Sequence, residues 1–132
     1  MTKNEIIEAV AFAIIPEGAV LIERDVGHGV SVGRSGNNQQ GLEMMLARMY
    51  CDLFQQQFDY LLDEPTPYLF ASLHSHLIAS RASQIACNRG LEFSLYPEAQ
   101  VIEGFGKMIT RLRGFAQELG IAYDEPVDPL GQ

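Results

Sequence analysis

The chain has 132 residues, of which 47% are hydrophobic and 20% charged, and this is the composition of a folded domain, not of a disordered segment. Seventeen acidic residues against nine basic ones give a net charge of −8 with histidine neutral. An acidic surface without a run of Lys and Arg repels phosphate, so we expect no direct binding to nucleic acid or to an anionic membrane. The charge instead favours solubility or a basic protein partner.

The cysteines and the first residues bear on the compartment. Cys51 and Cys87 each lie among apolar neighbours within an expected helix, which predicts buried free thiols in a reducing compartment. Residues 1–8 are polar and acidic, unlike a secretory signal, and no apolar run approaches the ~18 residues of a membrane span. We therefore predict a cytoplasmic protein with one globular domain at residues 1–121 and an extended acidic tail at residues 122–132.

A helix is the first element in chain order. Thr2 and Glu5 have the spacing of a capping box, in which each side chain accepts a hydrogen bond from the other residue's backbone N–H. Apolar residues then recur every three to four positions up to Ile14. Pro16 and Gly18 should end this helix.

Three short segments carry a strand pattern. Residues 19–23 are rich in β-forming side chains, and residues 30–34 and 91–95 alternate apolar with polar ones. Glycines within residues 25–29 allow the positive φ angles of a hairpin turn. We therefore predict a small antiparallel β-hairpin, or a three-stranded sheet when residues 91–95 join it.

Two long helices should form the centre of the fold, at residues 39–62 and 67–88. In the first, one apolar stripe predicts the buried face: Leu42, Met45, Leu46, Met49, Leu53, Tyr60 and Leu61, widened by Phe54 and Phe58. Its opposite edge should face water and carries the acidic residues Asp52, Asp59 and Asp63. The second helix has large apolar residues on one half and Ala or Ser on the other. We expect that Ala/Ser half to be covered within the chain or to contact a second copy.

The last helix follows Pro97 and is amphipathic. Its apolar residues repeat at three-to-four spacing: Val101, Phe105, Met108, Leu112, Phe115 and Leu119. Gly90 and Gly120 each stand where a C-cap glycine ends a helix. Together the elements predict an α+β fold that is predominantly α, a four-helix domain with two long central helices and the small antiparallel β element.

The glycine-rich stretch 27–38 is a candidate site for a small anion. Backbone N–H groups where such a loop enters a helix can hold an anion, and His28, Arg34 and Asn37 are the predicted ligand-binding residues. Neither the Walker pattern nor the dinucleotide-binding glycine pattern occurs. A hairpin turn followed by a helix-entry loop explains the glycines without a ligand.

We expect no metal site, no cofactor and no catalytic residues. His74 and His76 lie two residues apart in a helix, so their rings point about 200° apart and cannot share an ion. Neither cysteine has the electropositive surroundings of an activated thiol, and no nucleophile elbow occurs.

Protein binding is the function that these observations favour. We predict a small acidic regulatory module of the inhibitor, immunity or chaperone-like kind, without catalytic activity, which binds another and possibly basic protein. The predicted contact residues are those of the acidic edge and, on the Ala/Ser half of residues 67–88, Ser75, Ala79 and Ala82, where a homodimer is also possible. Two alternatives stay open: a small-molecule or anion-binding protein or enzyme that uses residues 27–38, and an acidic mimic of nucleic acid.

Overall fold

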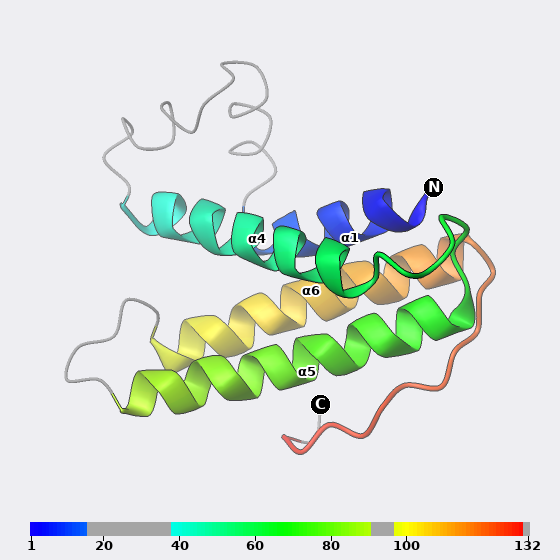
Figure 1. Cartoon of the computed structure of the whole chain (residues 1–132). Helices are drawn as coiled ribbons and strands as arrows, with labels where there is room; N and C mark the ends of the chain where they lie inside the picture. The colour runs from blue at the N-terminus through cyan, green and yellow to red at the C-terminus, as the bar shows by residue number, and fades with distance from the viewer. Residues whose placement is uncertain (16–37, 91–96, 131–132) are drawn as a thin grey trace.

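The computed structural model of the chain describes residues 1–15, 38–90 and 97–130, and the elements in these ranges are helical (Figure 1). They are α1 (Lys3–Ala11), the 3-10 helix η1 (Phe12–Ile14), α4 (Asn38–Gln57), α5 (Pro67–Arg89) and α6 (Glu98–Glu118). No β-strand occurs in these ranges, so the predicted α+β class is wrong. The expected strands at 19–23, 30–34 and 91–95 lie outside the described residues. Helix faces alone build the described core, and alternating patterns of about five residues are too short to decide a fold class against them.

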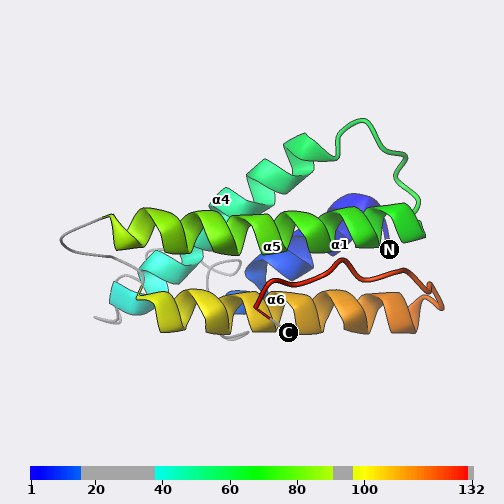
Figure 2. The same ribbon diagram turned by 90° about the horizontal axis from the view of Figure 1, so that it is seen from below.

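The helices form two layers. α5 and α6 run antiparallel beside each other, and α1 and α4 cover one side of this pair (Figure 1). After α6 the chain turns back and follows the opposite side of the pair, between α5 and α6 (Figure 2). We call residues 121–130, which form this returning segment, the tail.

α1 begins with the predicted capping box. The Glu5 backbone N–H donates to Thr2 Oγ1 over 3.2 Å, and the Thr2 N–H donates to Glu5 Oε1 over 2.9 Å. The helix ends at Ala11 and tightens into η1, so the regular α-helix is shorter than the apolar pattern indicated. Its apolar face is fully buried and consists of Ile6, Ile7, Val10 and Ala11. This face packs against α4 and α6, which places the shortest of the α-helices between them in the core.

α4 shows a different face to the core from the predicted one. Its buried residues are Met44, Ala47, Cys51 and Phe54, followed by Phe58 after the helix ends at Gln57. Met45, Met49 and Leu53 of the expected stripe are exposed. α4 carries two apolar stripes, and the buried one leads to the two phenylalanines, whose burial contributes most to stability. The same stripe has the small residues Ala47 and Cys51 on the side where α1 packs. α4 is thus an outer helix, not a central one.

α5 and α6 follow the predicted pattern closely. Thr66 Oγ1 accepts the Leu69 N–H over 3.3 Å at the start of α5, and Pro67 occupies the first turn. The expected stripe of α6 is buried except for Leu119. Gly120 has φ +66°, and the Ile121 N–H donates to the Ala116 carbonyl over 2.8 Å, which confirms a glycine cap there. Gly90 also caps its helix, but with φ −85° it lacks the left-handed conformation of such a cap.

A buried lysine joins the start of α1 to the end of α4. Lys3 Nζ donates to the carbonyl oxygens of Phe58 and Leu61, each over 2.8 Å, and the Lys3 N–H donates to the Asp63 carbonyl over 2.7 Å. Phe58 and Leu61 lie in the turn that follows α4, at the negative end of its helix dipole, so an ammonium group is well matched to their carbonyls. Sequence reasoning missed this role of Lys3, because its partners lie more than fifty residues away.

Replacing Lys3 with Met should lower the free energy of unfolding by roughly 2–3 kcal/mol, because two carbonyls would lose a charge-assisted donor. Urea unfolding followed by circular dichroism measures this loss. Lys107→Met is the matched control, since Lys107 is half exposed and pairs with Glu103 only at 3.5 Å. Equal effects of the two substitutions would contradict the assigned role of Lys3.

Candidate functional site

The sequence-predicted site residues fall into two groups. His28, Arg34 and Asn37, the predicted ligand-binding residues, lie outside the described residues, so that site stays a prediction. The six predicted partner-binding residues are all exposed: Asp52, Asp59, Asp63, Ser75, Ala79 and Ala82. The first three lie on α4 and just after it, and the other three lie on α5. Their exposure leaves both surfaces open to a partner within the described part of the chain.

The two cysteines differ in their surroundings. Cys51 is buried, and burial is the main cause that raises the pKa of its thiol, helped by the nearby carboxylates of Glu8 and Asp52. Cys87 is exposed in the last turns of α5, so the prediction that both thiols are buried is wrong for Cys87. Both are free thiols. A thiol with a raised pKa is less often ionised at neutral pH, so burial disfavours nucleophilic attack by Cys51.

An apolar stripe lies on the solvent side of α4. Met45, Met49 and Leu53 repeat at a spacing of four residues and are 49%, 60% and 42% exposed. The polar residue Gln56 follows one turn later on the same face of the helix, and Asp52 lies beside the stripe. Both residues are exposed. We call these five residues the outer face of α4. Large apolar side chains gathered on one exposed helix face are typical of a surface that contacts another molecule.

A cleft opens between η1, α4, α5 and α6. Its walls are mainly apolar: Ile14, Leu46, Leu77, Val101, Phe105 and Met108. Glu43, Glu103 and Lys107 contribute charge to its lining, and Tyr50 has a pKa raised by burial. The mainly apolar walls with a few charged groups suit the binding of a small or elongated apolar group.

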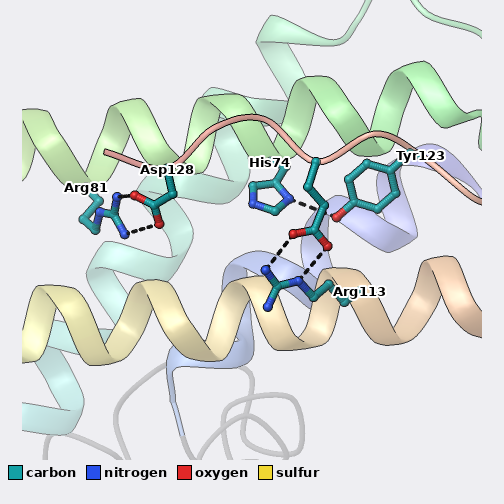
Figure 3. Close-up of polar contacts among 6 residues, drawn as sticks. His74, Arg81, Arg113, Tyr123 and Asp128 are labelled. Carbon is teal, nitrogen blue, oxygen red and sulfur yellow. Dashed lines mark hydrogen bonds and ion pairs between the residues drawn. The ribbon is translucent and has the colours of Figure 1, made fainter. Parts of the chain in front are cut away.

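The tail is attached to α5 and α6 by three side-chain contacts (Figure 3). In the first, the ring of Tyr123 stacks on Phe70 with 5.7 Å between centroids, and its hydroxyl shares a hydrogen bond of 2.9 Å with His74 Nδ1. In the second, Arg113 of α6 donates from Nε and Nη2 to both oxygens of Glu125, over 2.9 and 2.7 Å. Each contact joins residues that are far apart in sequence, which fixes the path of the tail.

The third contact is a buried ion pair. Arg81 Nη1 donates to Asp128 Oδ2 over 3.0 Å, and Nη2 donates to Oδ1, while the guanidinium lies over the Phe105 ring at 4.0 Å. Arg81 is only 3% exposed. A buried guanidinium needs a partner of opposite charge, because desolvation of an unpaired charge costs several kcal/mol. Asp128 of the tail meets this need, so the burial of Arg81 and the docking of the tail depend on each other.

These contacts were not predicted from the sequence, although polar residues on an apolar helix face indicated that partners must exist. His74 and Arg81 lie seven residues apart on the large apolar half of α5, where polar side chains require partners. His74 and His76 do face different surroundings, since His76 lies edge-on against Phe58 with 5.2 Å between centroids. The tail was expected to be extended and acidic, but its acidic residues were not paired with particular cations.

Burial sets the protonation of the first contact. His74, 2% exposed, has a pKa lowered mainly by desolvation, with Arg113 acting in the same direction and Glu125 and Asp128 opposing it. Burial, together with the Glu125 carboxylate, raises the pKa of Tyr123 to about 12. The hydrogen bond to Arg113 lowers the pKa of Glu125. At neutral pH the contact therefore joins a neutral imidazole to a neutral phenol beside an ionised carboxylate.

The lowered pKa of His74 should make stability fall on mild acidification. The unfolded chain takes up a proton near pH 6.5 and the folded chain only at lower pH, so this contribution is complete above pH ~6.5 and decreases below it. The pKa of Glu125 is also lowered, but its contribution is lost only below its unfolded pKa of about 4.3, which lies outside the pH range of this test. Urea midpoints at pH 7.5 and 5.5 should differ less in His74→Gln than in the unchanged protein. His76→Gln is the control and should keep the full difference; an equal difference in all three proteins would exclude His74 as the cause.

Comparison of the chain with protein-family models, with curated protein sequences and with solved structures gave no match. No helix within the described ranges has an apolar stretch long enough to cross a bilayer.

Proposed function

We propose that the protein is a non-catalytic binding module and that the outer face of α4 binds a basic amphipathic helix of another protein. One observation carries this proposal: Met45, Met49 and Leu53 are exposed in one line, although the opposite side of α4 is packed in the core. A helix has no need of a second apolar stripe for its own folding, and exposure of that stripe carries a cost in solubility.

The residue types of the outer face suit a helical partner. Side chains at intervals of four residues form a ridge, and such a ridge packs into the groove of a second helix. Methionine is unbranched and polarisable, so two methionines in the ridge adapt to partners of differing shape. The ridge is framed by polar side chains, which is the usual arrangement of an apolar contact centre with a wet rim.

The charge of the chain favours a basic partner. The net charge is −8, and Asp52 and Asp59 lie exposed on and just beyond α4. Arg48 also lies on α4 close to Asp52, so the attraction comes from the field of the whole chain and not from one ion pair. Such a field speeds the encounter with a cationic helix and disfavours an acidic one.

Methionine-methyl NMR tests this proposal with a synthetic 18-residue helix that has leucine on one face and lysine on the other. At physiological salt, the methyl signals of Met45 and Met49 should shift on titration, while those of the buried Met44 and Met108 should shift much less. Met49→Asp should weaken binding about tenfold or more, since a carboxylate would replace the centre of the ridge.

Ile102→Asp is the matched control, because Ile102 is an exposed apolar residue on α6. This variant should bind the peptide as the unchanged protein does. The proposal fails if Met45 and Met49 do not respond, or if a peptide with glutamate in place of lysine binds as tightly.

The exposed Ala/Ser half of α5 favours a second interaction, a homodimer. Ser75, Ala79 and Ala82 are exposed at alternating four- and three-residue spacing, and small side chains there let the backbone of a second helix approach closely. Ala79→Arg should place its charge in solvent and leave the fold intact. Light scattering should then show a change from twice the chain mass to the chain mass. An unchanged protein that is already monomeric at high concentration excludes this dimer.

A further inference from the structure

The tail lies along α5 and α6 in the manner of a bound peptide. We call the surface that it contacts the groove, and this surface includes Phe70, His74, Arg81 and Arg113. The contacts of the tail with α5 and α6 come from Tyr123, Glu125 and Asp128, while the backbone of residues 122–130 makes no backbone hydrogen bond to either helix in the described structure. Ile121, the first residue of the tail, closes the turn at Gly120 through its N–H bond to the Ala116 carbonyl, so the turn does not depend on residues 122–130. Because no backbone–backbone bond joins residues 122–130 to α5 or α6 in the described structure, the backbone hydrogen bonds of both helices stay complete when this segment departs.

The groove has a chemistry of its own, which the tail matches. Phe70 offers an aromatic face, His74 offers a ring nitrogen, and Arg113 and Arg81 each offer two N–H donors in a fork. This order matches an aromatic residue followed by an acid two positions later and a second acid three positions after that. Two forked guanidinium groups bind carboxylates with defined geometry, which lysines do not. In a chain of net charge −8, the groove is therefore a local cationic site.

We propose that the groove between α5 and α6 is a recognition site for an extended acidic peptide of a partner protein, with the chain's own tail as the resident ligand. The partner's peptide carries the same pattern of one aromatic and two acidic residues and replaces the tail on His74, Arg113 and Arg81. This site lies on the side of the α5/α6 pair opposite α4, so it is separate from the outer face of α4 (Figure 2).

The attached tail competes with a partner's peptide for the groove, so it determines how tightly that peptide must bind. A covalently attached segment acts at an effective concentration on the order of millimolar, so a peptide added in solution must compete against that concentration. Weakening one contact of the tail should therefore strengthen the binding of an external peptide. This result distinguishes a groove that accepts an external peptide from a contact that the fold requires, since weakening a required contact would unfold the helices and leave no site for the peptide.

The probe is a fluorescein-labelled peptide with the sequence of residues 121–130, followed by fluorescence anisotropy against the full chain. The unchanged protein should bind it weakly. Tyr123→Ala and Asp128→Asn should each bind it at least about tenfold more tightly, because the tail competes less well. Adding Arg113→Gln to either variant should weaken binding several-fold, whereas adding Arg111→Gln, a neighbouring exposed arginine of α6, should not.

Tyr123→Ala keeps the test decisive if Asp128→Asn unfolds, because it leaves the Arg81–Asp128 pair in place and removes only a half-buried ring. Circular dichroism and urea unfolding establish which variants are folded. The proposal is overturned if a folded Tyr123→Ala chain does not bind the peptide at millimolar concentration. It is overturned equally if a peptide with Glu125→Gln and Asp128→Asn binds as tightly.

Discussion

Nine residues are too few for a helix to persist alone in water, because nucleation costs more than two turns of hydrogen bonds return. α1 is nevertheless the most deeply buried helix of the described structure, with Ile6, Ile7, Val10 and Ala11 fully covered. Its apolar side chains give α4 and α6 a common surface, and its first residue, Lys3, holds the end of α4. The relative placement of α4 and α6 therefore depends on α1. In turn, α1 is a stable helix only because it packs against α4 and α6.

Features that arise from neighbouring residues could be predicted from the sequence. The capping box of Thr2 and Glu5, the threonine and proline at the start of α5 and the glycine cap at Gly120 each involve residues within one or two turns. The buried stripe of α6 could also be predicted, because that helix has a single apolar face. In all these cases the neighbouring residues favour a single local structure, so the feature can be predicted without knowing the rest of the fold.

Features that depend on distant residues could not be predicted. α4 has two apolar stripes, and its packing against α1 and η1 decides that Met44, Ala47 and Phe54 turn inward while Met45 and Met49 turn outward. The partners of Lys3, His74 and Arg81 are 47 to 58 residues away. Polar residues on an apolar helix half indicate that partners exist, but spacing along the chain does not identify them. The candidate surfaces differ in the same way. The local pattern placed Asp52 on a face toward water, left open whether Ala79 is covered within the chain, and did not indicate the groove for the tail.

The large sequence separation of the Arg81–Asp128 pair has a consequence for the order of folding. The two residues are 47 positions apart, and closing so long a loop costs chain entropy, so this pair is expected to form after contacts between residues that are near in sequence. Until residues 121–130 fold back, Arg81 keeps its hydration shell. The loss of that water and the arrival of Asp128 are therefore one event, because a guanidinium group is desolvated at low cost only when a carboxylate replaces its water.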